Sequence, residues 1–173
     1  MNIFLAPMKF SNTALLSSVA EELFHKFKDD IKIIDIDLDI TKSFSQERAQ
    51  YFSTQIIAEA IKKTGDLNGK VLILTEADLY IPVLTFVFGE AQLNGKHSIV
   101  SVCRLHEEFY SEKTDENLLK ERTMKEIFHE LGHTFGLKHC ADWDCVMHSS
   151  TSIEEVDIKG SYYCKKCERE VDI

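Results

Sequence analysis

Residues 129–140 constrain this chain more than any other segment, because three histidines and a glutamate follow one another at the spacing of a metal site. The sequence there is HELGHTFGLKHC. On a helix, residues four apart share one face with Cβ atoms roughly 5–6 Å apart, so His129 and His133 can bind one ion. Gly136 can end the helix in the left-handed conformation that glycine tolerates best. His139 follows it and is the expected third ligand.

Glu130 gives this group of histidines a chemical purpose. Three protein nitrogens leave the fourth position of a tetrahedral zinc ion to water, which distinguishes a catalytic zinc from a closed structural one. Glu130 lies next to His129 on the helix, where its carboxylate can reach that water as a general base. A helix that carries the pentapeptide HExxH by chance is the alternative. Because Gly136 and His139 also stand at the spacing that a third ligand needs, we favour the metal site over a chance match.

Four of the five cysteines form a second group directly after the histidines. Cys140 and Cys145 lie close together, and Cys164 and Cys167 form a CxxC pair. Four thiolates in two close pairs indicate a closed tetrahedral zinc site that holds a loop. Two disulfides are an alternative that needs an oxidising compartment. A redox-active CxxC is less favoured, because this pair lies in a polar tail and not between a strand and a helix.

Together these residues resemble the archaemetzincins, a branch of the metzincin clan of zinc metallopeptidases. The resemblance rests on HELGHTFGLKHC, Cys145, Met147 and the terminal CxxC, over about residues 129–167. It implies a twisted mixed sheet with an active-site helix and a backing helix, plus a small zinc-bound C-terminal segment. It also implies two zinc ions per chain, one catalytic at His129, His133 and His139 and one structural at Cys140, Cys145, Cys164 and Cys167.

The resemblance further implies a zinc-dependent peptidase that acts on peptides or proteins, with Glu130 as general base and Met147 packed beneath the zinc ligands. Some metzincins place a tyrosine two residues after that methionine, where this chain has Ser149, so transition-state stabilisation would fall mainly to the metal. The alternative is a catalytically weak zinc protein that binds peptides or regulates. Glu130 favours the enzyme, because a binding protein has no need of it. We also expect Cys164→Ser to spare the first metal.

Composition supports one compact domain spanning residues 1–173, with an N-terminal part to about 136 and a C-terminal part from about 137 that carries the structural zinc. The chain is 44% hydrophobic, which is enough for a sizeable core. Its net charge of −9 disfavours nucleic acid and an anionic membrane surface as partners. We find neither a membrane-spanning apolar run nor a signal-peptide pattern at the N-terminus. We therefore expect a cytoplasmic monomer, since thiols stay reduced in that compartment.

Hydrophobic periodicity predicts alternating strands and helices, and thus an α/β or α+β fold with a mixed sheet. The predicted strands are residues 2–6, 34–40, 70–75 and 99–103. The predicted helices are residues 13–28, capped by Ser11 or Asn12, residues 46–64, and one that begins near Thr114 or Asp115 and carries the histidines. By the resemblance, residues 83–90 are an edge strand lining the substrate cleft, with an ordinary sheet strand as the alternative.

The remaining candidate residues are isolated in the sequence. His25, His97 and His106 are predicted to lie at the surface or around a ligand rather than to bind a metal. Cys103 is predicted to be a buried, inert thiol. Trp143, between the first two cysteines, is predicted to cover the structural site.

Overall fold

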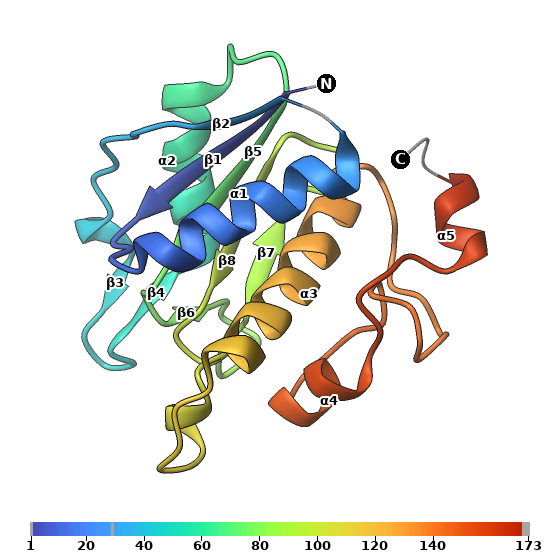
Figure 1. The fold of residues 1–173 in the computed structure, drawn as a ribbon. Coiled ribbons are helices and arrows are strands. Elements are labelled where there is room, and N and C mark those ends of the chain that lie inside the picture. The colour runs from blue at the N-terminus through green and yellow to red at the C-terminus, as the bar shows by residue number, and fades with distance from the viewer. Residues whose placement is uncertain (1, 29, 171–173) are drawn as a thin grey trace.

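The computed structural model describes residues 2–28 and 30–170, and a five-stranded sheet forms its centre (Figure 1). The first four strands in spatial order are parallel, and the fifth is an antiparallel edge strand. In that order they are β2 (Asp30–Ile33), β1 (Asn2–Met8), β5 (Lys70–Thr75), β8 (His97–Ser101) and β7 (Gly89–Ala91). The mixed sheet is confirmed.

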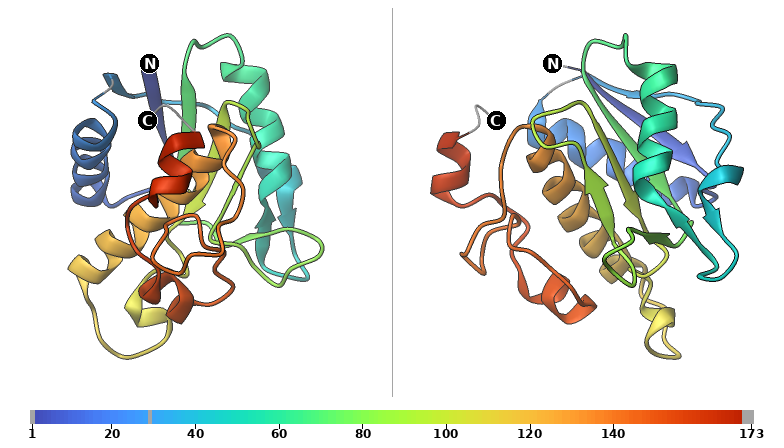
Figure 2. Two further views of the ribbon diagram at one scale, coloured as in Figure 1. Left: turned by 90° about the vertical axis from the view of Figure 1, so that its right-hand side faces the viewer. Right: turned by 180° about the vertical axis from the view of Figure 1, so that it is seen from behind.

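Helices cover both faces of this sheet. α1 (Thr13–Phe27) and α3 (Glu116–Thr134) lie on one face and α2 (Ser53–Thr64) lies on the other (Figures 1 and 2). The parallel strands are apolar on both faces because both are covered. Leu5 and Leu72 pack in the core that contains α1 and α3, whereas Ala6 and Ile73 pack with α2. The α/β class is therefore confirmed.

α1 and α3 begin where the sequence predicts. The Oδ1 atom of Asn12 accepts a hydrogen bond from the N–H of Leu15, and that of Asp115 accepts one from Leu118, both at 2.9 Å. Each side chain satisfies a backbone donor that has no partner inside the helix. Polar N-caps therefore fix the starts of the two helices that pack on the site-bearing face.

The strand predicted at residues 34–40 is wrong. β2 ends at Ile33, and residues 34–40 belong to no strand in the described chain. The alternation still reports the local environment correctly, because Ile36 is half-buried against the α2 core while Asp35 and Asp37 are exposed. An alternating apolar and polar pattern shows which side chains are buried. It does not show that a neighbouring strand is present to form backbone hydrogen bonds.

Two further boundaries differ from the prediction. The helix predicted over 46–64 begins only at Ser53, because the preceding residues form the short strands β3 (Phe44–Ser45) and β4 (Gln50–Phe52). These pair in a second sheet with β6 (Leu79–Tyr80). Of the predicted edge strand at 83–90, only the end belongs to β7, although β7 does lie at the sheet edge. Two short 3-10 turns occupy Thr41–Ser43 and Glu107–Phe109.

After α3 the chain leaves the sheet and forms a C-terminal segment beside that helix (Figure 2). It contains two short helices, α4 (Ile153–Ile158) and α5 (Lys165–Glu170). The four candidate zinc-binding cysteines lie within this segment. Across the described residues, no helix has both the length and the apolar character needed to cross a membrane.

Candidate active site

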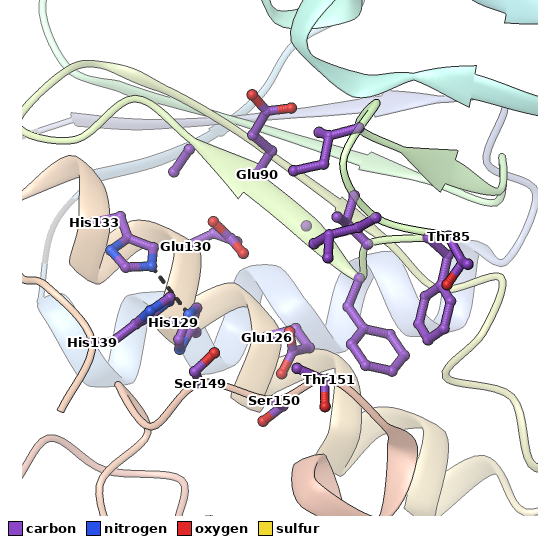
Figure 3. Close-up of a pocket in the computed structure, with 17 residues that line it drawn as sticks. Thr85, Glu90, Glu126, His129, Glu130, His133, His139, Ser149, Ser150 and Thr151 are labelled. Atoms are coloured by element: carbon purple, nitrogen blue, oxygen red, sulfur yellow. Dashed lines mark hydrogen bonds between the residues drawn. The ribbon is translucent and has the colours of Figure 1, made fainter. Parts of the chain in front are cut away.

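α3 places its two faces in different environments. Leu119, Ile127 and Leu131 are buried in the main core and hold the helix against the sheet. The opposite face lines a cavity of about 390 Å³ (Figure 3). His129 and Glu130 are only 5% exposed even there. The residues that α3 contributes to the cavity are Glu126, His129, Glu130 and His133.

A glycine turn at the end of α3 brings His139 back towards the helix. Gly136 has φ +102°, where any other residue would be strained. Its N–H donates to the carbonyl of His133 at 2.9 Å, and the N–H of Leu137 donates to that of Gly132 at 3.0 Å. This pair of hydrogen bonds is typical of helices closed by a left-handed glycine. The turn predicted at Gly136 is confirmed.

The three histidines converge on one point. One ring nitrogen from each of His129, His133 and His139 lies within 4.8 Å of the others. The Nε2 atoms of His129 and His133 are 3.1 Å apart. Two nitrogens that bind a tetrahedral zinc ion with bonds of ~2.0–2.1 Å are themselves about 3.3 Å apart. The spacing therefore fits a zinc ion.

Backbone carbonyls fix which nitrogen of two of these rings, His129 and His133, faces this point. The Nδ1–H of His129 donates to the carbonyl of Val146 at 2.8 Å, and that of His133 donates to the carbonyl of Leu137 at 2.7 Å. A carbonyl oxygen can only accept, so in a neutral ring each Nε2 presents a lone pair. Burial is the main cause that lowers the pKa of all three histidines, including His139, and so favours neutral rings. Facing lone pairs repel unless a cation lies between them.

Glu130 presents a buried carboxyl group to the same cavity. Burial raises its pKa well above the usual range, nearby Glu126 adds to the effect, and the ammonium group of Lys159 opposes it. A carboxyl group with raised proton affinity is suited to accepting a proton and giving it back near neutral pH. A Cβ at Gly89 would lie 2.7 Å from the Cγ of Glu130, so β7 approaches this side chain too closely for a larger residue.

The other walls of the cavity come from two segments on either side of α3. One is β7 with the loop before it, from Leu84 onward, which is most of the segment predicted to line the cleft. The other contains Ser149, Ser150 and Thr151, which are labelled in Figure 3. Met147 is fully buried, and a Cβ on Gly132 would lie 2.4 Å from its Sδ atom. The thioether therefore packs directly on the helix that carries the histidines.

The four clustered cysteines also converge. Their sulfur atoms lie within 4.8 Å of one another, with 3.8 Å between Cys140 and Cys164 and 3.7 Å between Cys145 and Cys167. Sulfurs bound to a tetrahedral zinc ion at ~2.3 Å are about 3.8 Å apart, whereas a disulfide needs about 2.0 Å. All five cysteines, each within the described chain, are free. The spacing fits a four-thiolate zinc site and not a pair of disulfides.

A buried ion pair beside the histidines was not predicted. The Nζ atom of Lys159 lies 2.7 Å from the Oε1 atom of Glu126, with side chains 0% and 5% exposed. Glu126 lies one helical turn before Glu130, so its spacing on the cavity face was a signal that could have identified it. Lys159 comes from the end of α4 and has no comparable signal, because only the fold brings it to α3.

The isolated candidates lie outside both ligand groups. His25 is exposed, and His106 is partly exposed. The prediction that His97 lies at the surface or around a ligand is wrong, because it is only 2% exposed in β8, with its ring between Thr64 and Gln92. Its place in a strand covered on both faces explains the burial.

The sequence also predicts the environments of Cys103 and Trp143. Cys103 is half-buried, not fully buried as predicted. Trp143 is exposed, and the centre of its ring lies 3.8 Å from that of His148. His148 in turn bonds through Nδ1 to the carbonyl of Cys140 at 3.0 Å. Trp143 is thus linked through His148 to the backbone of Cys140, and its role as a cover for the structural site stays a prediction.

This fold and this site define a zinc-dependent metallopeptidase. A sequence model of peptidase family M54 matches residues 39–172. The archaemetzincin of Pyrococcus horikoshii is 42% identical over 133 residues, which cover 75% of this chain and 70% of that protein. The crystal structure of archaemetzincin from Archaeoglobus fulgidus, complexed with malonate, has a TM-score of 0.84 and 33% identity, and the match covers 99% of this chain and 100% of that one.

A zinc-dependent peptidase from Methanocorpusculum labreanum has a TM-score of 0.86 and 31% identity, with 97% of this chain and 98% of that chain covered. The chain therefore belongs to peptidase family M54, the archaemetzincins. The resemblance inferred from the motif is confirmed.

Proposed function

We propose that this protein hydrolyses peptide bonds at a zinc ion bound by His129, His133 and His139, with Glu130 as the general base. The observation that supports this most strongly is the 3.1 Å approach of two Nε2 atoms whose Nδ1–H groups donate to carbonyls. With both rings neutral, such an arrangement is favourable when a cation lies between them. A buried carboxyl group in the same cavity then provides the base.

The chain's own groups account for the proton transfers. A zinc ion at the histidines supplies Lewis-acid chemistry, which polarises the substrate carbonyl and makes water a better nucleophile. Glu130 accepts a proton from the attacking water and delivers it to the leaving amine. Its raised pKa suits both steps, because the carboxyl group must hold the proton between them. The free edge of β7 can pair with an extended peptide backbone and align it along the cavity.

We propose in addition that Cys140, Cys145, Cys164 and Cys167 hold a second, structural zinc ion, which makes two per chain. The 3.7 and 3.8 Å sulfur spacings support this count. Reduced cysteines of this kind persist in a reducing compartment, so we place the protein in the cytoplasm. We further propose that residues 1–173 act as one catalytic domain in a monomer, with peptides or proteins as substrates and neither nucleic acid nor membrane as partner.

The role of Glu130 is tested by Glu130→Gln, which keeps the shape of the side chain and removes its basicity. We expect turnover to fall by about 10²–10⁴-fold while the zinc content stays at the wild-type value. Cleavage is measured by mass spectrometry on a peptide library, and metal content by elemental analysis. Glu121→Gln is the matched control, because Glu121 lies on the same helix, is 58% exposed, and pairs with Lys125.

Unchanged turnover in Glu130→Gln would contradict the proposed base. Wild-type protein that binds two zinc ions and library peptides but cleaves none would favour a peptide-binding protein instead.

A further inference from the structure

We propose that the two metal sites are coupled, because occupation of the four-cysteine site positions two of the three histidines of the other site. The proposal rests on the two zinc sites proposed above. Cys140 is then a positioning residue for His139, and Cys145 is a positioning residue for His129. The sites would then not be independent, contrary to the expectation that Cys164→Ser spares the first metal.

The first connection is covalent. His139 and Cys140 are consecutive residues whose side chains belong to different ligand groups. The N–H of Cys140 donates to the carbonyl of Met147 at 2.9 Å, which fixes the backbone between them. A metal ion that holds the Cys140 sulfur therefore also restricts the position from which the His139 ring extends.

The second connection runs through one peptide group. The carbonyl of Val146, which accepts the Nδ1–H of His129 at 2.8 Å, belongs to the residue directly after Cys145. Cys145 is fully buried, and its sulfur accepts the N–H of Cys164 at 3.3 Å. The N–H of Val146 donates to the carbonyl of Tyr162 at 2.8 Å. The carbonyl of Val146, which orients His129, thus lies next to Cys145 in the chain and is tied to the segment that carries Cys164 and Cys167.

In this region Val146 and Met147 are packed in the core, but no regular secondary structure of the described chain holds the backbone around them. Residues 135–152 contain no helix or ladder strand in the described chain, and a single bridge joins Cys145 to Tyr162. Figures 1 and 2 show this part of the chain outside the central sheet, beside α3. The cysteine group joins it to the segment that carries Cys164 and Cys167. Without a cation, the four sulfur atoms offer only weak hydrogen bonds to hold the segments together.

His133 differs from the other two histidines. The carbonyl that accepts its Nδ1–H belongs to Leu137, in the turn that closes α3. That turn is fixed by helix hydrogen bonds and needs no cysteine. Loss of the structural metal should therefore disturb His129 and His139 and leave His133 in place.

The expected size of the coupling follows from the effect of supporting hydrogen bonds on metal sites. Loss of such a partner typically lowers metal affinity by about 10–100-fold. We expect at least a tenfold loss at the histidines, which corresponds to about 1.4 kcal/mol. Because coupling is reciprocal, an empty histidine site must weaken metal binding at the cysteines by the same factor.

The forward test compares Cys164→Ser with wild type. Cys164 lies in the C-terminal segment and is remote in sequence from every histidine of the site, so the substitution acts on them through the cysteine group. Zinc affinity at the histidines is measured by competition with chelators of known affinity, and ¹⁵N resonances of the imidazoles report which rings bind. Cys103→Ser is the matched control, because Cys103 is a half-buried free thiol outside the group. We expect weaker binding in Cys164→Ser alone.

The reverse test does not require a cysteine variant to fold. His133→Ala removes a histidine ligand on α3 that has no link to the cysteines. Cobalt(II) is the probe, because its thiolate absorption reports the cysteine site separately. Compared with wild type whose histidine site is already occupied, we expect cobalt affinity at the cysteines to fall by about the factor found in the forward test, and to stay unchanged in Glu130→Gln, which keeps all three histidines.

Each result decides the question. Weaker binding at the second site in both tests, with unchanged controls, supports the coupling. Wild-type affinity at the histidines of a folded Cys164→Ser, or at the cysteines of His133→Ala, overturns the coupling and leaves the proposed peptidase intact. A wild-type protein that binds fewer than two zinc ions overturns both the coupling and the proposed count of two zinc ions per chain.

Discussion

Lys159 is the most completely buried charged residue of the described chain. Its ammonium group is inaccessible to water and pairs with the buried carboxylate of Glu126 at 2.7 Å. Lys159→Met leaves that carboxylate buried without a partner, which typically costs about 3–5 kcal/mol. We expect this loss in the free energy of unfolding, measured by urea denaturation. The double variant Glu126→Gln/Lys159→Met should recover much of it, because no uncompensated charge remains.

An exposed ion pair of the same type provides the control for this prediction. Lys120 pairs with Glu22 at 3.1 Å, and their side chains are 39% and 46% exposed. Solvent screens such pairs, so Lys120→Met should change the free energy of unfolding by less than about 1 kcal/mol. If Lys159→Met costs no more than Lys120→Met, burial does not make the Glu126 pair important.

Among the elements, the end of α3 depends most on one backbone conformation. Gly136 has φ +102°, and the nearest atom to an added Cβ is 3.6 Å away, so Gly136→Ala meets strain but no clash. We expect a loss of about 1–2 kcal/mol in the free energy of unfolding. Zinc affinity at the histidines should also fall, because this turn directs His139 towards the other two rings. Urea denaturation and chelator competition measure the two effects.

The control for Gly136→Ala lies at the end of another helix. Lys28 ends α1 with φ +53°, and its N–H donates to the carbonyl of Phe24 at 2.8 Å. Lys28→Gly should therefore raise the free energy of unfolding, by up to about 1 kcal/mol, because glycine adopts this conformation without strain. A stabilised Gly136→Ala, or a destabilised Lys28→Gly, would mean that backbone strain does not control these helix ends.

Elements were predictable from sequence where their signals are local. The caps at Asn12 and Asp115 and the apolar spacing of α1 and α3 lie within the helices themselves, and these helices were located correctly. β3 and β4 were missed because they are only two and three residues long, too short for a periodic pattern, and because the other partner of β4, β6, lies beyond α2. The ligand residues were predictable because metal chemistry demands particular side chains. The carbonyls of Val146 and Leu137 were not, because every residue has one.

At the scale of the whole molecule, buried neutral histidines make stability depend on pH. Burial, more than the nearby charge of Lys96, lowers the pKa of His97 below 6.5. Below that pH the unfolded chain binds a proton that the folded chain does not, so stability is complete above 6.5 and falls as the pH drops towards the folded pKa. Glu130 acts oppositely, because its raised pKa makes stability fall as the pH rises above 4.5.

The contribution of His97 can be isolated from these opposing effects by a difference measurement. We expect the free energy of unfolding of the metal-free protein to fall less steeply between about pH 6.5 and 5.5 in His97→Gln than in wild type, by up to about 1.4 kcal/mol per pH unit. Urea denaturation with excess chelator measures both slopes, and the effect of Glu130 cancels. His25→Gln should keep the wild-type slope, because His25 is exposed. Equal slopes in wild type and His97→Gln would show that His97 is protonated in the folded core, with a second proton donated to Thr64 or Gln92.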